Sequence, residues 1–325
     1  MSTAKHVQKL KNKKVRTSDK DPRRLRTYSF VLTLLVIFLI LGAAYYESLP
    51  KVEHMPDTFV FTTRDWMAFV PSNAQYVGYV NYKAAYFASG NSSLFGSEVV
   101  FEFPQLGFQV LPFDVSNEIE IELPQPPYSG AASILQLSSS KQSELIQDLT
   151  SISPIKISPP VVYLGHTIYQ LLMRRLGDKT ATLGYVTITN NRIILSNDKT
   201  ASLRNVDAIL DQITTSSPGL FDNPTVRQAV YATGVTDQDC IGLFVGSFPT
   251  QMNDTKMAAK SVVGTGSSIS VSRAFLFPSS DIALARLTEA QKLYRNADSY
   301  RILDPWLVVT YNYPATRLPG ELIGI

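Results

Sequence analysis

Cysteine and histidine are scarce in this 325-residue sequence, and their scarcity excludes several kinds of site. The single cysteine, Cys240, rules out an intrachain disulfide, which favours an exported prokaryotic protein over a disulfide-stabilised secreted domain. Because Cys240 begins the apolar run 240–245, we expect a buried structural thiol. His6 and His54 precede the expected folded domain, so a zinc site or a Ser-His-Asp triad would depend on His166 alone.

The sequence also lacks the short motifs of the common enzyme classes. It contains no HExxH, GxSxG, CxxC or GxxxxGK[ST] pattern. The glycine-rich stretch 264–268 precedes an expected strand, whereas phosphate-binding loops precede a helix, so we expect an ordinary flexible loop there. We therefore expect a protein without enzymatic activity and without a cofactor. A hydrolase that uses only carboxylates remains an open alternative.

Charge is missing from residues 27–46, and this absence has the clearest consequence. Twenty residues in a helix span about 30 Å, the thickness of the hydrocarbon core of a bilayer. Tyr28, Tyr45 and Tyr46 stand at the two ends, where aromatic residues gather at membrane interfaces. The run predicts a transmembrane helix that contacts the lipid bilayer through Tyr28–Tyr46. Gly42 and Ala44 keep open the alternative of a signal peptide cleaved before Tyr45.

Positive charge is concentrated in front of this run. Residues 1–26 hold ten of the 30 Lys and Arg residues and two of the 27 Asp and Glu residues, which leaves 20 basic and 25 acidic residues for the rest. Since Lys and Arg stay on the cytoplasmic side, we expect a cytoplasmic N-terminus, one membrane pass and an extracytoplasmic C-terminal domain. The basic tail suits anionic lipid headgroups. Nucleic acid is disfavoured as its partner because the tail has no aromatic residues to stack on bases.

The pattern of the remaining chain predicts a mixed fold. We divide the sequence into a basic tail (1–26), a transmembrane helix (27–46), a linker (47–57) and an extracytoplasmic α+β domain (58–325), mainly of antiparallel sheet with helices. Residues 117–123 alternate between polar and apolar side chains, as a half-buried strand does, and Pro124, Pro126 and Pro127 are expected to end it. Further strands, hairpins and helices are expected at 75–82, 131–137, 141–149, 161–164 with 167–173 around the turn Gly165-His166, 182–189 with 192–196, 240–248, 268–277, 282–294 and 306–313. Two more helices are expected, one opened by Asp198 and one by Asp222 or Asn223 with Pro224.

The order of these elements repeats. A strand, a variable excursion, a second strand and a serine-capped helix occur once after residue 75 and again after residue 240. This order predicts two similar α+β units, at about 66–235 and 236–325.

Three segments resemble a prokaryotic family of membrane-anchored extracytoplasmic proteins without assigned function. They are residues 70–81, which enter the first strand, residues 189–198, and residues 219–224 before the second short helix. The resemblance covers about half of the outer domain and rests on structural motifs. It supports the fold and implies no activity.

Glu118, Glu120 and Glu122 are the candidate metal ligands. Alternate positions of a strand lie about 7 Å apart on one face, so three carboxylates could offer oxygen ligands to Ca²⁺. The favoured interpretation is instead the solvated face of a strand. Asn91 and Asn253 begin two glycosylation sequons in polar stretches of the outer domain.

These observations predict a single-pass membrane protein whose outer domain binds or scaffolds a partner. Anchoring raises the effective concentration of that domain near other proteins of the envelope or of a membrane complex, which are the expected partners. The alternative is an extracytoplasmic hydrolase or carbohydrate-active enzyme that relies on carboxylates.

Overall fold

The computed structural model divides the chain into two compact units, Met1–Pro50 and Lys51–Ile325. We consider each unit by itself. The described residues are 22–48, 51–56, 59, 61, 64–89, 99–103, 108–113, 115–125, 128–137, 155–174, 180–189, 192–196, 205–235, 240–247, 252–265 and 267–322.

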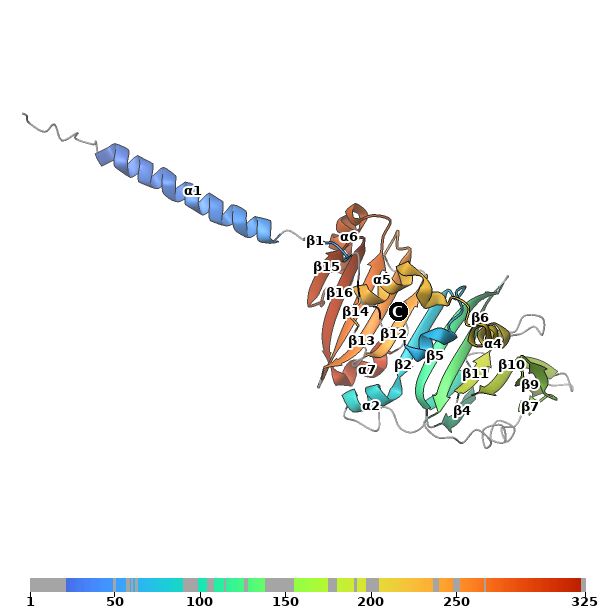
Figure 1. The fold of residues 1–325 in the computed structure, drawn as a ribbon. Coiled ribbons are helices and arrows are strands. Elements are labelled where there is room, and N and C mark those ends of the chain that lie inside the picture. The colour runs from blue at the N-terminus through green and yellow to red at the C-terminus, as the bar shows by residue number, and fades with distance from the viewer. Residues whose placement is uncertain are drawn as a thin grey trace, which may run out of the picture. The chain divides into compact units, whose positions relative to one another are not determined.

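The first unit contains one long helix, α1 (Pro22–Ser48), of 27 residues (Figure 1). Its side chains are described over residues 32–47, and all of these are exposed. Large apolar side chains point outward around the whole helix, including Phe38, which is 70% exposed. Within the described part of the chain, no helix combines the length and the apolarity needed to cross a membrane.

The second unit is built on one large sheet, so the chain is an α+β protein. The described strands of this sheet number fourteen, and their order is β1-β15-β16-β14-β13-β12-β2-β5-β6-β11-β10-β9-β7, with β8 also paired to β9. Neighbours are antiparallel except β1 and β15. The strands are β1 (Val52–Glu53), β2 (Tyr76–Asn81), β5 (Val115–Gln125), β6 (Tyr128–Leu137), β7 (Ile155–Ile157), β8 (Val161–Tyr163), β9 (His166–Arg174), β10 (Thr180–Thr189), β11 (Arg192–Ser196), β12 (Cys240–Gly246), β13 (Met257–Thr265), β14 (Ser268–Leu276), β15 (Ser299–Leu303) and β16 (Trp306–Pro314). A separate hairpin pairs β3 (Val99–Phe103) with β4 (Phe108–Phe113).

Strand order is the same on both sides of the central pair β2 and β12 (Figure 1). Going outward, the first side has β2, β5, β6, β11 and β10, and the second has β12, β13, β14, β16 and β15. On each side, three strands that are consecutive within this sheet lie next to one another. A hairpin from later in the chain fills the next two positions, and its second strand pairs with the third of these strands while its first strand lies further out. The internal duplication stays a prediction, and this matching order is the observation that favours it.

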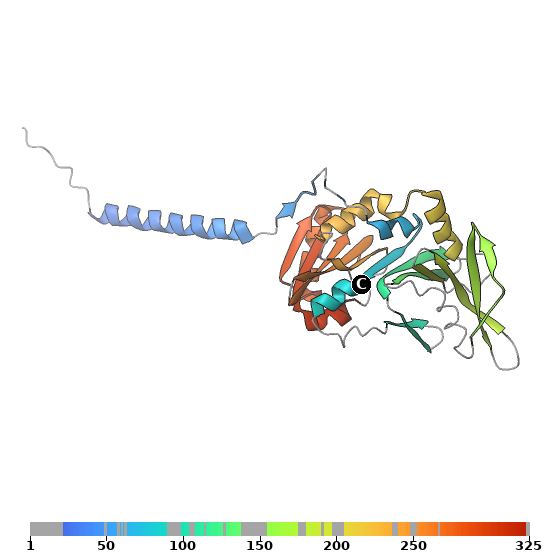
Figure 2. The same cartoon turned by 60° about the horizontal axis from the view of Figure 1, so that its bottom comes forward.

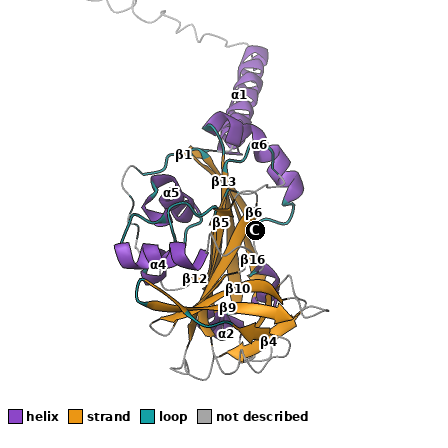
Figure 3. Ribbon diagram, turned by 90° about the vertical axis from the view of Figure 1, so that its right-hand side faces the viewer, coloured by secondary structure: helices purple, strands orange, loops and turns teal. Residues whose placement is uncertain are grey.

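Helices cover both faces of the sheet (Figures 2 and 3). The first face carries α4 (Asn205–Thr215), α5 (Pro224–Ala232) and the short helices η1 (Asp65–Phe69) and η2 (Leu220–Asp222). The second face carries α2 (Tyr82–Ser89), α6 (Ser280–Leu293) and α7 (Leu318–Glu321), and η3 (Ala315–Arg317) leads into α7. Each face has its own apolar cluster.

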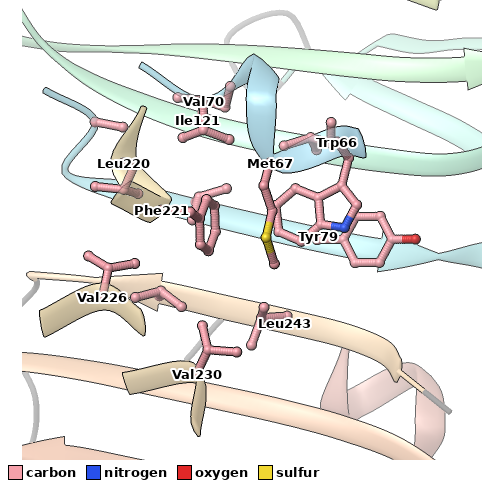
Figure 4. Packing of buried hydrophobic residues seen from close by; sticks show 14 of the residues in the cluster. Trp66, Met67, Val70, Tyr79, Ile121, Leu220, Phe221, Val226, Val230 and Leu243 are labelled. Carbon is pink, nitrogen blue, oxygen red and sulfur yellow. The ribbon is translucent and has the colours of Figure 1, made fainter. Parts of the chain in front are cut away.

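The cluster of the first face is centred on aromatic side chains (Figure 4). The ring of Trp66 stacks on that of Tyr79, with centroids 4.4 Å apart and planes at 2°. Phe221 meets Trp66 edge-on at 5.2 Å. Leu243 and Ile121 from the sheet and Val226 from α5 close the cluster. Burying these large rings is the main contribution of η1 and η2 to the core.

Most expected elements are present. In β5 the alternation holds, because Ile119, Ile121 and Leu123 are buried while Glu120 is exposed. The hairpin β10–β11 pairs Thr189 with Arg192. The expected helix at 224 is α5, whose cap Asn223 accepts a hydrogen bond from the N–H of Thr225 at 2.9 Å.

Three local expectations need correction. The strand β5 runs past Pro124, which pairs with Ser129, and ends at Gln125, directly before the position of Pro126. The turn of the β8–β9 hairpin is Leu164-Gly165, since both have positive φ (49° and 80°) and His166 already pairs with Tyr163. Gly264 belongs to β13, where it pairs with Ile269, so the expected flexible loop is a tight strand connection. The expected helix at 141–149 and the cap Asp198 lie outside the described residues.

Candidate functional site

A row of paired residues crosses the second face at the centre of the sheet. Glu120 pairs with Gly78, Gly78 with Phe244, Phe244 with Lys260 and Lys260 with Arg273. Directly paired residues project to the same face, so one row carries an acidic residue at one end and two basic residues at the other. Two strands separate Glu120 from Lys260, or about 14 Å at the usual strand spacing. The two ends are therefore separate electrostatic environments.

Lys260 is the most unusual member of this row. Its side chain is only 1% exposed, yet it lies in an otherwise apolar part of β13. The Nζ atom lies 3.3 Å from Oε2 of Glu321 and 5.6 Å from the centre of the Phe244 ring. Burial, reinforced by the positive charge of Arg273, lowers the pKa of Lys260 to about 8, although Glu321 acts in the opposite direction.

Arg273 shares the same carboxylate. The Nη2 atom of Arg273 lies 3.3 Å from Oε2 of Glu321, so one oxygen accepts from both cations. The guanidinium also lies over the ring of Tyr294 at 5.8 Å. Tyr294 and Tyr311 meet edge-on at 6.4 Å, and Tyr311 stacks on Tyr313 at 5.3 Å. Burial raises the pKa of Tyr311, so these phenols stay neutral and surround the cations with aromatic surface.

Glu321 reaches this position because the short helix α7 is fixed to the sheet. Leu318 at its start is fully buried, and Leu322 after its end donates its N–H to the carbonyl of Leu318 at 3.1 Å. A side chain at Gly242 would come within 3.0 Å of Leu322, so the missing side chain in β12 leaves room for this leucine. Between Leu318 and Leu322, the carboxylate of Glu321 is held over Lys260 and Arg273.

The three predicted glutamates lie at the acidic end of the row. Glu118 is half-buried and accepts a hydrogen bond of 2.6 Å from the hydroxyl of Tyr82, which begins α2. Burial, with the charge of Glu120 added, raises the pKa of Glu118, while the Tyr82 hydrogen bond acts against this rise. Partial desolvation and the negative charge of Glu122 also raise the pKa of Glu120, although this residue is exposed by its solvent-accessible area. Among the described residues, no group of three His, Cys, Asp or Glu side chains has the geometry of a metal site.

The other residues noted in the sequence are dispersed. Cys240 is buried at the start of β12, as expected for a structural thiol. His166 is partly exposed at the first position of β9, away from the acidic residues of β5. Asn253 is exposed in a turn before β13, and Asn91 lies outside the described residues.

A separate open cleft of about 280 Å³ lies on the first face. It is formed where η1 meets the end of α4 and the start of η2. Its lining is Met67, Ala68, Phe69, Gln212, Ile213, Ser216, Ser217, Gly219, Phe221 and Asp222. The lining is mainly apolar, and the Nε2 of Gln212 donates to the carbonyl of Ser217 at its rim.

Sequence reasoning missed Lys260, Arg273 and Glu321. The available signal was Lys260 itself, a charged residue inside the apolar pattern of 257–263. The partners could not be found in this way, because they lie 13 and 61 residues further along the chain. Arg273 meets Lys260 through strand register, and Glu321 meets it through the packing of α7 on the sheet.

No protein-family model and no curated protein matches the chain. Solved structures of the protein TP0453 are similar to it. Crystal forms I and III have sequence identities of 11% and 12%, a TM-score of 0.49, and cover 80% of this chain and 97% and 98% of the other. Crystal form IV has 11% identity, a TM-score of 0.46, and covers 78% and 94%. At these values the likeness carries no information about function.

Proposed function

We propose that this chain is a single-pass membrane protein whose extracytoplasmic α+β domain binds or scaffolds a partner at the cell envelope. The observation that carries the proposal is the apolar run 27–46, which lies within α1 and exposes large side chains around the whole helix over its described part. A helix that is apolar on all sides needs an apolar environment, and a bilayer supplies one.

Orientation follows from the tail. The ten basic residues before the run favour a cytoplasmic N-terminus in contact with anionic lipid headgroups, and therefore an external location for the unit Lys51–Ile325. Within that unit, the buried cations and the raised carboxyl pKa values offer recognition sites for polar partners. The proposed partners are other proteins of the envelope or of a membrane complex.

Membrane insertion is tested with charged substitutions in the helix. The double variant Leu35→Arg/Leu39→Arg places two guanidinium groups near the middle of the run, at a cost of about 3 kcal/mol each on insertion scales. We expect the full-length protein to need detergent for extraction and this variant to lose membrane association. The control Leu35→Ile/Leu39→Val keeps the run apolar and should behave as the unmodified chain. Recovery of the unmodified chain as a freely soluble species would contradict the anchor.

Orientation and binding need separate measurements. A reporter fused at residue 200 should report an external location, and protease added to intact cells should digest the outer unit. Purification in mild detergent should recover a defined complex if the outer unit is a scaffold. A protein that elutes alone and monomeric removes the support for the scaffold role while leaving the anchor intact.

A carboxylate-dependent hydrolase is the second candidate. The observation that favours it is the raised pKa of both Glu118 and Glu120, since shifted carboxyl groups are typical of acid–base catalysis. Their spacing of about 7 Å along one strand face would leave room for a water molecule. Hydrolysis of polysaccharide by the purified outer unit, abolished in Glu118→Gln and in Glu120→Gln, would establish this role. Activity that is equal in both variants and the unmodified chain would exclude these residues.

A further inference from the structure

The two cations of the cluster on the second face share one acceptor atom. Both ion pairs end on the same atom, Oε2 of Glu321, and both distances are 3.3 Å. Charge-assisted hydrogen bonds between nitrogen and carboxylate oxygen are usually 2.7–2.9 Å long, so Glu321 is held slightly too far from both cations. The tether to α7 explains this, because Leu318 and Leu322 fix the helix at either end.

Arg273 also has a donor left over. Its Nε atom is buried and has no hydrogen-bond acceptor among the described residues. A guanidinium binds a carboxylate most favourably through two parallel hydrogen bonds, one from Nε and one from a terminal nitrogen. Glu321 accepts a hydrogen bond from Nη2 of Arg273 and none from its Nε. The cluster therefore offers a second N–H to a carboxylate that can approach more closely than Glu321 does.

The cluster is accessible from the side of Glu321. Arg273 is 24% exposed and Glu321 15%, whereas Lys260 lies beneath them. The helix α7 has only four residues, and its exposed Gly320 precedes Glu321 directly. Moving this carboxylate away would uncover two cations without disturbing any strand of the sheet.

We propose that Lys260 and Arg273 form a binding site for a carboxylate ligand, and that Glu321 is a built-in occupant which the ligand displaces. The incoming carboxylate accepts two parallel hydrogen bonds, from Nε and Nη2 of Arg273, and its negative charge neutralises the buried ammonium of Lys260. Phe244 and Tyr294 provide the aromatic walls beside the cations. The site belongs to the unit Lys51–Ile325, so it does not depend on the membrane anchor.

The test compares acetate binding to the unmodified chain and to Glu321→Gln. Glutamine keeps the shape of the side chain but removes its charge, so acetate no longer competes with a resident carboxylate. We expect one acetate to bind the variant about tenfold more tightly than the unmodified chain, measured by titration calorimetry with chloride holding ionic strength constant. Arg273→Lys keeps the positive charge but removes the two parallel N–H donors of the guanidinium. In the Glu321→Gln background it should lose most of the affinity for acetate. Equal acetate affinity in all three proteins would overturn the proposal.

Displacement of Glu321 has its own readout in the unmodified chain. The N–H of Leu322 is protected by the carbonyl of Leu318, and it should exchange several-fold faster at saturating acetate when α7 is released. Unchanged exchange at Leu322 despite bound acetate would refute displacement. The peptide Ac-Ala-Glu-Ala-NH2 distinguishes the source of the ligand: tighter binding than acetate indicates a protein carboxylate, and weaker binding indicates a small organic acid. If neither acetate nor the peptide binds, the proposed site is overturned.

Discussion

Lys260 and Glu321 form an ion pair of 3.3 Å in which the lysine is almost completely buried. The pair joins the centre of the sheet to a four-residue helix near the end of the described chain. A buried ion pair is a weak source of stability, because removing both charges from water costs nearly as much as their attraction returns. Specificity therefore explains the pair better than stability does, and the pair makes the pH response of the protein predictable.

Stability should rise with pH between about 8 and 10.5 through Lys260. Its pKa falls from 10.5 in the unfolded chain to about 8 in the folded one, so in this window the unfolded chain binds more protons. The free energy of unfolding then increases with pH, by at most about 1.4 kcal/mol per pH unit. Lys260→Met removes this contribution. Urea unfolding of both proteins at several pH values should show that the difference in their free energies of unfolding changes only inside this pH window.

Glu118→Gln should stabilise the protein at neutral pH. Burial raises the pKa of Glu118, so its favourable contribution is complete at low pH and is lost as the pH rises through the folded value. Glutamine still accepts the hydrogen bond from Tyr82 and carries no charge to desolvate. In thermal unfolding from pH 4 to pH 7, the melting temperature of the variant should rise relative to that of the unmodified chain as the pH increases. A constant difference across this range would contradict the assignment.

Gly219→Ala should be strongly destabilising. A Cβ atom at Gly219 would lie 2.9 Å from the backbone carbonyl oxygen of Val70, where η2 meets the segment after η1. Backbone cannot move aside cheaply, so we expect a loss of about 1–3 kcal/mol. Gly320→Ala is the matched control, since nothing lies within 4 Å of its added atom and the position is helical. Equal unfolding midpoints in urea for the two variants would contradict the close contact.

Trp66→Ala and Trp66→Phe should differ widely. Alanine removes the ring that stacks on Tyr79 and leaves a cavity in the first face, at a cost of about 3–5 kcal/mol. Phenylalanine keeps an aromatic ring and removes the indole N–H, which is buried without an acceptor among the described residues. We expect the phenylalanine variant to retain most of the stability in chemical denaturation. A loss as large as that of alanine would show that the indole itself is required.

Local patterns predicted the individual strands well. The alternation Glu118, Glu120, Glu122 against Ile119 and Ile121 placed β5 and its buried apolar face without any knowledge of the fold. Similarly, the group Ser279, Ser280 and Asp281 predicted the start of α6, where the hydroxyl of Ser279 accepts from the N–H of Ile282. These signals work because side-chain periodicity and helix capping depend on residues that are close in sequence.

Strand order and the ion cluster were not predictable from such signals. No strand was predicted within residues 249–267, yet they include β13, whose Lys260 lies beside Arg273 and beneath Glu321. Pairing of β2 with β12 brings Gly78 opposite Phe244, more than 160 residues away. Local propensity contains no information on such pairing, which is decided by the packing of whole faces.

The junction of β2 with β12 also constrains how the chain can assemble. Until residues 240–246 are available, one edge of β2 has no neighbour and its peptide groups can pair with a foreign chain. Synthesis delivers β5 and β6 long before β12, so the edge of β2 stays unpaired until β12 is made. Completion of the molecule is thus tied to a late, long-range event, and shortening the chain before residue 240 would leave an aggregation-prone fragment.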